Sequence, residues 1–521
     1  MINLKNKNVL VMGLGLVGGG LGATKWLYRQ GAKITITDLR DKKTLTPTLK
    51  KLMGLNIKYV LGRHRKRDFE RANLVIKNPG VAINSPYLKI AQKSGVPVTS
   101  DIELFSQRWP GKIIALTGTK GKSTTVHLIY HILKQVKKPC YLGGNVGETP
   151  LLFLTHAKPN QTAILELSSF QLENLKIAPD VSLITNVFPD HLNRHQTMAK
   201  YTAAKSNIFN HQSPSQYAIF NYDNKILRQL ADRVKAKLIF FSTKITTRPA
   251  NCQILFCVKD NQLMVVDGRS SHILCTLNKI KLLGQHNLKN ILAAAATAYL
   301  IKIKPAIVEK AINSFAGIPH RLELVRIIKG IKYYNDTTAT NPDAAIAALA
   351  TLGQLKIKNK SASWRTKIKN IILIGGGADK QLNFHHLSLE IKKTCKQVIM
   401  LSGAATPRFI QALKGINYPA KNITEFDNFK KAIYFAKEIA ENGDIVLLSP
   451  ACASFGMFAN EFDRGKQFVK IIKDIKPFVS SSPAYRTGRL DKIRQKEKAP
   501  RSDSKAPLSR NQMWRSSQGQ S

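Results

Sequence analysis

The chain has 521 residues, of which 43% are apolar and 22% are charged. This composition is typical of a globular protein and excludes a collagen, a coiled-coil rod and a chain that is disordered throughout. At about 150 residues per domain, the length predicts three or so domains, each with its own core. The 81 basic residues exceed the 32 acidic residues by 49, which favours anionic partners. Because the excess is spread along the chain, we attribute it to a lysine-rich surface and expect no specific nucleic acid partner.

The sequence predicts a cytoplasmic protein without membrane insertion. No window approaches 18 consecutive apolar residues, and the amino-terminal segment reads as a strand and a glycine turn, not as a signal peptide. The six cysteines are scattered and form no C-x-x-C pair. They are expected to be free thiols, because neither a zinc ribbon nor a disulfide framework has this spacing.

The first 110 residues have the pattern of a parallel-sheet domain. Residues 8–13 and 32–38 read as strands that flank a glycine turn and a helix, and the apolar runs at 74–80 and 96–100 continue the sheet. We expect a Rossmann-like domain over residues 1–110.

The glycine turn of this first domain has the spacing of a nucleotide-binding fingerprint. Gly13, Gly15 and Gly18 fit G-x-G-x-x-G, and Asp38 lies 20 residues after Gly18. Taken alone, the pattern leaves NAD, another nucleotide and a merely tight turn as alternatives.

The strongest feature is ALTGTKGKSTT (115–125), which lies between a predicted strand (112–118) and an apolar helix. Successive N–H groups of a glycine turn at a helix N-terminus form an anion site. Lys122 can reach the outer phosphates of ATP, and the Ser123 hydroxyl can bind Mg²⁺. Further strands at 162–168 and 181–187 and a helix at 288–301 complete a central domain over residues 111–317.

Polar side chains follow the next two strands of the central domain. Glu166 lies at the end of one strand, and Asp190 and His191 follow the other. The carboxyl ends of parallel strands are where α/β proteins bind ligands, so metal binding is favoured over a surface role.

A third α/β unit occupies residues 318–478. Its predicted strands are 331–336, 370–377, 397–403 and 444–450. Residues 355–370 read as a basic loop insertion. Residues 479–521 read as a disordered basic tail, because the composition shifts to Ser, Pro, Gln, Lys and Arg from Ser480 onward.

Taken together, these segments resemble the Mur ligase family in order over about residues 8–478, and most closely its D-glutamate-adding branch. The segments that carry the resemblance are GTKGKSTT, GGNVG (143–147), ELSSFQL (166–172), DHLNRH (190–195), YTAAK (201–205), GQHNLKN (284–290), GIPHRLE (317–323), NDTTATNPDA (335–344) and SPACASFGMFANEFDRG (449–465). The sequence departs from the family at Lys120, where Asn is usual, at Thr338, where some members have Lys, and at Gly456, where some have Asp.

The resemblance implies an ATP-dependent ligase of peptidoglycan precursor synthesis. The expected reaction adds D-glutamate to UDP-N-acetylmuramoyl-L-alanine through an acyl phosphate, with ATP and two Mg²⁺ ions, in a monomer. Alternatives are a sister ligase that adds another amino acid such as L-glutamate, a basic nucleic-acid-binding protein, and an NAD-dependent oxidoreductase. The glycine fingerprint is reassigned to UDP.

The resemblance also assigns residues to four groups. The catalytic residues are Lys122, His191, Lys205 and Asn145. The metal ligands are Ser123, Glu166, His191 and Lys205, where Lys205 looks like the lysine that the family carbamylates. The ATP-binding residues are Gly118, Thr119, Lys120, Gly121, Lys122, Ser123, Thr124, Asn287, Asn290, His320, Arg321 and Asp336. The UDP-substrate residues are Leu16, Val17, Asp38, Arg40, Asn78, Pro79 and Gly80, and the amino-acid-binding residues are Thr340, Lys380, Ser454 and Phe455.

Overall fold

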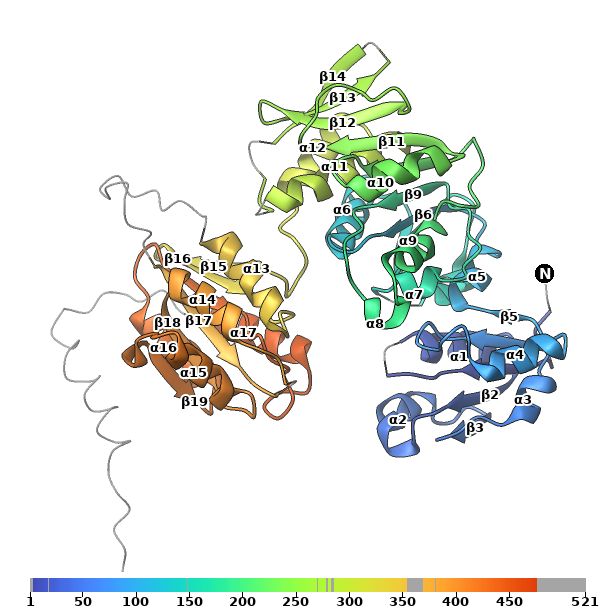
Figure 1. Cartoon of the computed structure of the whole chain (residues 1–521), viewed down its shortest axis with the longest axis horizontal. Helices are drawn as coiled ribbons and strands as arrows, with labels where there is room; N and C mark the ends of the chain where they lie inside the picture. The colour runs from blue at the N-terminus through green and yellow to red at the C-terminus, as the bar shows by residue number, and fades with distance from the viewer. Residues whose placement is uncertain are drawn as a thin grey trace, which may run out of the picture. The chain divides into compact units, whose positions relative to one another are not determined.

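The chain forms three β-sheets, each flanked by helices, in a computed structural model that describes residues 3–16, 18–147, 149–268, 270–277, 280–282, 285–353, 369–379 and 381–475 (Figure 1). The three sheets confirm the predicted α/β fold class. Val17, Lys380, most of the 355–370 stretch and the predicted tail lie outside the described residues. Within the described ranges, none of the helices combines the length and the apolar character that a bilayer crossing needs.

The first sheet has five parallel strands in the order β3-β2-β1-β4-β5. The strands are β1 (Asn8–Met12), β2 (Lys33–Asp38), β3 (Ile57–Leu61), β4 (Leu74–Lys77) and β5 (Val98–Thr99). The helices are α1 (Gly19–Arg29), α2 (Lys42–Leu49), α3 (Lys66–Glu70), α4 (Pro86–Lys93) and α5 (Asp101–Ser106). The predicted strand 74–80 is three residues too long, because Pro79 has no N–H for a sheet ladder and the chain turns after Lys77.

The second sheet has nine strands in the order β14-β13-β12-β11-β10-β9-β6-β8-β7. The strands are β6 (Lys112–Thr117), β7 (Cys140–Gly144), β8 (Thr162–Glu166), β9 (Val181–Ile184), β10 (Tyr217–Asn221), β11 (Lys237–Ser242), β12 (Ile254–Lys259), β13 (Gln262–Asp267) and β14 (Ser270–Thr276). The helices are α6 (Lys122–Gln135), α7 (Ser169–Leu172), α8 (Leu192–His195), α9 (Met198–Ser206), α10 (Lys225–Leu230), α11 (Gln285–Leu300) and α12 (Pro305–Ser314). The strand order reverses beside β6, and such a switch point is where open α/β sheets bind ligands.

Strand β6 shows why the strands of this sheet are continuous apolar runs in the sequence. Ile113 and Ala115 pack into one hydrophobic cluster, whereas Ile114 and Leu116 pack into another. A parallel strand covered on both faces needs apolar residues at consecutive positions. Strand β12 runs parallel to β11, and β13 and β14 extend the sheet as antiparallel strands. These three strands were not predicted.

The third sheet has six strands in the order β15-β16-β20-β17-β18-β19, and only β15 runs antiparallel to its neighbour. The strands are β15 (Glu323–Ile328), β16 (Ile331–Asn335), β17 (Ile371–Gly376), β18 (Cys395–Leu401), β19 (Ile423–Phe426) and β20 (Ile445–Leu448). The helices are α13 (Pro342–Leu352), α14 (His385–Thr394), α15 (Thr406–Gly415), α16 (Phe429–Ile439) and α17 (Glu461–Asp474). The four strands predicted here correspond to β16, β17, β18 and β20.

Candidate active site

The glycine turn after β6 has the predicted strand, turn and helix order. Gly118 and Gly121 have φ values of 150° and 86°, a region that favours glycine. A Cβ on Gly118 would lie only 1.9 Å from Thr185 Oγ1, so the close approach of the two segments also requires glycine. Helix α6 begins at Lys122, directly after Gly121. Its first N–H groups have no acceptor within the helix, which makes the turn suited to an anion.

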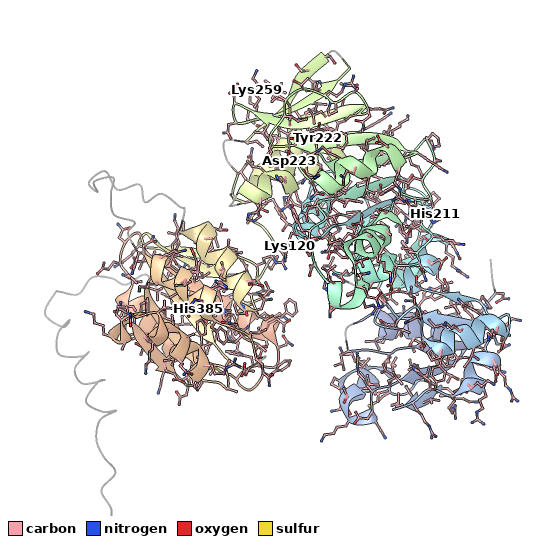
Figure 2. All side chains as sticks on the ribbon, viewed as in Figure 1. Lys120, His211, Tyr222, Asp223, Lys259 and His385 are labelled. Carbon is pink, nitrogen blue, oxygen red and sulfur yellow. The ribbon has the colours of Figure 1, made fainter. Side chains whose placement is uncertain are left out.

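The segment after β9 supports this glycine turn, residues 118–121, which we call the phosphate loop. Thr119 N donates to Asn186 O at 2.9 Å, and Lys120 N donates to Asn186 Oδ1 at 2.8 Å. The Thr185 hydroxyl donates to Lys120 O at 2.7 Å. The side chain of Lys120 is itself exposed (Figure 2). Sequence reasoning missed the role of Thr185 and Asn186, although two polar residues after the apolar strand VSLI were the signal.

Two lysine side chains converge on the carbonyl of Gly118. Lys122 Nζ donates to this oxygen at 3.0 Å, and Lys205 Nζ donates to it at 2.9 Å. Burial lowers the pKa of Lys122, although the carboxylate of Glu166 opposes this shift. Burial, followed by the neighbouring ammonium of Lys122, lowers the pKa of Lys205 to about 7. A substantial fraction of Lys205 is therefore a neutral amine near neutral pH.

Glu166 presents a carboxylate oxygen that lacks a hydrogen-bond partner. The residue is 1% exposed at the end of β8, and its Oε1 accepts from Asn145 Nδ2 at 2.9 Å. Its Oε2 is buried without a partner. A buried carboxylate is costly unless it is paired or binds a cation, so the oxygen fits a metal ligand. The described residues contain no group of three or more His, Cys, Asp or Glu side chains arranged for a metal ion, so other ligands would have to complete the site.

His191 lies farther out than the two lysines. Its side chain is about half exposed, its ring lies 5.0 Å from that of Phe170 at an angle of 60°, and its Nε2 lies 3.8 Å from Asp190 Oδ2. The residue has φ of 53° and occupies the N-cap position of α8. Tyr201 was missed by sequence reasoning: its hydroxyl is 3.1 Å from Thr119 Oγ1, and its ring lies 4.6 Å from Lys205 Nζ.

Helix α11 covers the other side of the phosphate loop. Thr125 Oγ1 donates to Asn290 Oδ1 at 3.3 Å, and Asn290 Nδ2 donates to Asn287 Oδ1 at 2.7 Å. A Cβ on Gly121 would lie 2.4 Å from Asn290 Oδ1, so the amide is close against the turn. Both predicted asparagines are thus brought to the loop.

The glycine turn of the first domain is organised by a carboxylate. Asp38 Oδ2 accepts from Gly15 N at 3.1 Å, and Asp38 Oδ1 accepts from Arg40 N at 2.9 Å. Asn78 lies on the other side of the turn, 3.1 Å from where a Cβ on Gly13 would be. Leu16 is 52% exposed beside them. The structure therefore gathers most of the predicted UDP-side residues around one turn.

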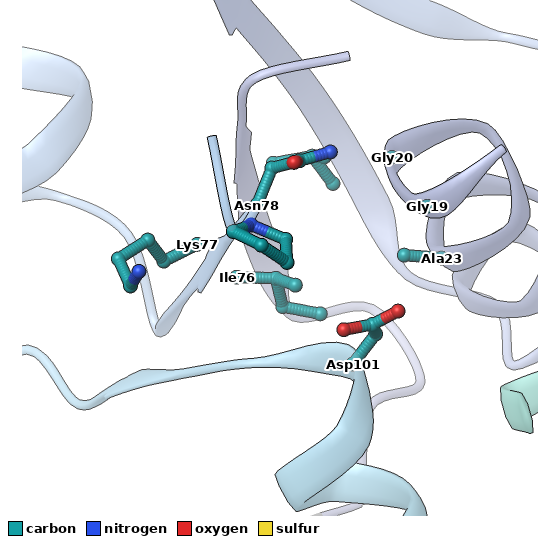
Figure 3. Close-up of a pocket in the computed structure, with 9 residues that line it drawn as sticks. Gly19, Gly20, Ala23, Ile76, Lys77, Asn78 and Asp101 are labelled. Atoms are coloured by element: carbon teal, nitrogen blue, oxygen red, sulfur yellow. The ribbon is translucent and has the colours of Figure 1, made fainter. Parts of the chain in front are cut away.

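A cavity of about 10 Å³ lies beneath this turn (Figure 3). Its lining residues are Val11, Gly19, Gly20, Ala23, Ile76, Lys77, Asn78, Pro79 and Asp101. It has room for one water molecule and not for a nucleotide. Burial raises the pKa of Asp101 to about 6, although Asp101 accepts hydrogen bonds from Ile102 N and Thr149 Oγ1.

Arg194 joins the central domain to the predicted substrate loop. Its guanidinium donates to the carbonyls of Pro79, Gly80 and Val81, each at 3.2 Å, and to Glu173 Oε2 at 3.3 Å. Arg194 lies in the DHLNRH segment that carries the family resemblance, but the sequence predicts no role for it.

Apart from Lys380, which lies outside the described residues, the predicted residues of the third domain gather at the carboxyl ends of its parallel strands. Asp336 follows β16 and accepts from Leu322 N at 3.0 Å and from Ser449 Oγ at 2.9 Å, and burial raises its pKa to about 7. His320 Nδ1 lies 2.9 Å from Asn335 Nδ2, and Arg321 follows it in the chain. Thr340 lies in the loop after β16.

Ser454 and Phe455 lie in the loop after β20. Ser454 is buried and its hydroxyl has no partner, whereas Phe455 is 68% exposed. Ala378, after β17, donates its N–H to Ala453 O at 3.0 Å, which places the two loops side by side. A buried hydroxyl without a partner is typical of a ligand-binding position.

The fold and the site define a three-domain α/β protein with a phosphate loop in its central domain. The Mur ligase middle domain matches residues 116–298, the Mur ligase MurD-like N-terminal domain matches 7–100, and the Mur ligase glutamate ligase domain matches 320–452. The chain belongs to the Mur ligase family.

Two relatives cover nearly the whole of the described chain. The UDP-N-acetylmuramoylalanine--D-glutamate ligase of Roseiflexus sp. is 40% identical over 478 residues, which are 91% of this chain and 99% of the relative. The protein of the same name from Borreliella afzelii is 37% identical over 90% of this chain and 98% of its own length. Among solved structures, the UDP-N-acetylmuramate-alanine ligase of Thermotoga maritima has a TM-score of 0.56 at 19% identity, covering 90% of this chain and 100% of its own. The last likeness concerns the fold alone.

Proposed function

We propose that this protein is an ATP-dependent ligase that adds D-glutamate to UDP-N-acetylmuramoyl-L-alanine. The observation that carries the proposal is the phosphate loop in which Lys122 meets Lys205, in a chain 40% identical to a relative that bears the name of this activity. Loops of this kind hold the phosphates of ATP, and amide formation from a carboxylate requires such a phosphoryl donor.

The proposed reaction has two steps. A carboxylate is a poor electrophile, so a terminal carboxylate oxygen of the substrate first bonds to the γ-phosphorus of ATP, and ADP leaves. The amine nitrogen of D-glutamate then bonds to the carbonyl carbon, loses a proton, and phosphate leaves. The N–H groups of the loop and the Lys122 ammonium bind and orient the phosphates in both steps, so catalysis is mostly positioning and charge stabilisation.

Ser123, Glu166, His191 and Lys205 are the residues that would hold Mg²⁺. The unpartnered Oε2 of Glu166 supports this assignment. The ion, when bound, would neutralise phosphate charge. We propose that these residues hold two Mg²⁺ ions.

Lys205 is proposed to be carbamylated. Its neutral amine would attack carbon dioxide, and a proton would leave to give a carbamate, which offers oxygen ligands in place of an ammonium. The lowered pKa of about 7 supports this reaction, because only the neutral amine is a nucleophile. A carbamate would also remove the repulsion between two ammonium groups at the Gly118 carbonyl.

The two substrates are proposed to bind on different domains. Leu16, Val17, Asp38, Arg40, Asn78 and Gly80 would bind the UDP substrate, and Thr340, Lys380, Ser454 and Phe455 would bind D-glutamate. His320, Arg321 and Asp336 would complete the ATP site from the third domain. We also expect a cytoplasmic monomer.

Purified protein with UDP-N-acetylmuramoyl-L-alanine, ATP, Mg²⁺ and a panel of amino acids tests the proposal. The expected result is phosphate release that depends on D-glutamate and a product whose mass has increased by one glutamyl residue. Equal or greater turnover with L-glutamate would assign a different acceptor. The absence of ATP consumption with every acceptor would overturn the ligase proposal itself.

A further inference from the structure

The loop that begins at the last residue of β10 contacts two segments that support the phosphate loop, although none of its residues was predicted to have a role. This loop, residues 221–224, has the sequence NYDN, and we call it the NYDN loop. Asn221, Asp223 and Asn224 all have buried side chains. Polar side chains at such depth need partners, and their partners identify what the loop holds in place.

On one side, the NYDN loop binds the segment that supports the phosphate loop. Asn221 Nδ2 donates to Thr185 O at 2.9 Å, and Asn224 Nδ2 donates to Val187 O at 3.1 Å. The Thr185 hydroxyl in turn donates to the carbonyl of Lys120 in the phosphate loop at 2.7 Å. Thr185 therefore links the NYDN loop to the phosphate loop on this side.

On the other side, Asp223 binds helix α11. Asp223 Oδ2 lies 3.1 Å from Lys289 Nζ, and the side chain of Asp223 is 2% exposed whereas that of Lys289 is 34% exposed. Lys289 lies between Asn287 and Asn290, the two residues that α11 brings to the phosphate loop. The ion pair thus fixes the first turns of the helix that carries these amides.

The carboxylate of Asp223 is held rigidly by three further donors. Ser242 Oγ donates to Oδ1 at 2.5 Å, and the N–H and hydroxyl of Thr243 donate to Oδ2 at 3.2 and 2.8 Å. Burial alone would raise the pKa of Asp223, but the bonds from Ser242, Thr243 and Lys289 outweigh it and lower the pKa. Asp223 is therefore a fixed anion, anchored to the end of β11, to which Lys289 attaches.

We propose that Asp223 is a positioning residue for the nucleotide site, which holds α11 through Lys289 so that Asn287 and Asn290 meet the phosphate loop. It does not touch ATP in this assignment. A binding group that is misplaced by a fraction of an ångström binds its ligand more weakly. Loss of the ion pair should therefore cost more free energy of ATP binding than free energy of unfolding. The inference rests on the proposed ligase function.

Steady-state kinetics of Lys289→Met in the full-length protein tests the proposal. The KM for ATP should rise about tenfold, while kcat and the KM for UDP-N-acetylmuramoyl-L-alanine should change by less than about threefold. Lys289→Arg, which retains the charge, should restore most of the ATP affinity. Asp223→Asn should have a similar effect, and the double variant should be no worse than the worse single variant, since both remove one interaction.

A matched control comes from the third domain, where Lys396 pairs with the largely buried Asp444. Lys396→Met removes a comparable ion pair far along the chain, and it should leave the KM for ATP unchanged even where the melting temperature falls. A rise in the KM for ATP in this control, or an unchanged KM in Lys289→Met, would overturn the inference. An inactive parent protein would instead reject the proposed function, so the two failures are distinguishable.

Discussion

The molecule contains two glycine turns that look alike in sequence and differ in charge. Both follow a buried strand of a parallel sheet, and both precede a helix that begins directly after a glycine of positive φ. In the first domain, the carboxylate of Asp38 binds the N–H of Gly15. In the central domain, the Nζ atoms of Lys122 and Lys205 both donate to the carbonyl of Gly118.

This difference shows that glycine spacing predicts a backbone shape and that neighbouring side chains decide its ligand. A carboxylate at the turn accepts from hydroxyl or N–H groups, as a ribose or a base would provide. The buried ammonium of Lys122 instead suits the negative charge of a triphosphate. The two turns should therefore respond differently to substitution.

The largest expected effect comes from Lys122→Met. The substitution keeps most of the side-chain volume and removes the charge from the phosphate loop, so kcat should fall by about a thousandfold. Phosphate release in the D-glutamate assay measures the loss. Binding of the UDP substrate, followed by calorimetry, should be retained, because Lys122 is absent from the turn of the first domain. Retention of full activity would remove Lys122 from the catalytic machinery.

Adding a methyl group to each turn compares their packing. Gly118→Ala should lower the free energy of unfolding by about 3 kcal/mol, because its Cβ would lie 1.9 Å from Thr185 Oγ1. Gly18→Ala has nothing within 4 Å of its Cβ and only the backbone strain of φ at 60° and ψ at −49°, so its expected cost is smaller, about 2 kcal/mol. Urea unfolding of both variants gives the two values. Equal losses would contradict the tighter packing of the phosphate loop.

The buried Asp101 beneath the first turn predicts a pH dependence of stability. Burial raises its pKa from 3.8 to about 6, so the folded state binds a proton between these pH values that the unfolded state has released. The resulting stabilisation is fully present below about pH 4 and is lost as the pH rises through about 6.

Replacement of Asp101 isolates this contribution. The expected change in unfolding free energy for the parent chain is about 3 kcal/mol across this window, and Asp101→Asn should remove it. Urea unfolding at a series of pH values compares the two proteins. Parallel profiles would show that Asp101 is not the responsible group.

The sequence predicts the three α/β units, the phosphate loop and most of the residues that gather around each turn, because buried strands and glycine turns depend on local chemistry. It leaves out the strands β3, β7, β10, β11, β15 and β19. It does not predict the hairpin of β12 and β13. Their two-residue turn, Asp260 and Asn261, has positive φ at both positions, which suits a type I′ turn, and it lacks the Gly that usually marks one.

The scaffold behind the site was also beyond sequence reasoning. Asp223 reaches Lys289 across 66 positions of the chain, and Arg194 reaches Gly80 across 114. Such contacts follow from how sheets and helices pack, and no local pattern encodes them. Polar residues at the end of a buried strand or directly after it, as at Asn221 and Thr185, indicate that an interaction is made there, but they do not identify its partner.

The smallest expected effect tests the first turn directly. Asp38→Asn preserves the shape of the side chain and removes the charge that two N–H groups share, at Gly15 and Arg40. Because hydrogen bonds to a charged acceptor are stronger than those to a neutral one, the KM for UDP-N-acetylmuramoyl-L-alanine should rise about tenfold. The KM for ATP should remain within about twofold, since Asp38 lies in the other turn.

This pattern is the mirror image of the Lys289→Met pattern, in which ATP binding weakens and UDP-substrate binding is retained. The KM for ATP and the KM for the UDP substrate should be measured in both variants. If each variant raises a different one of these two constants, the two turns bind different substrates. If Asp38→Asn instead weakened ATP and the UDP substrate equally, the carboxylate would be acting on the fold of the whole chain. The assignment of the first turn to UDP would then lose its basis.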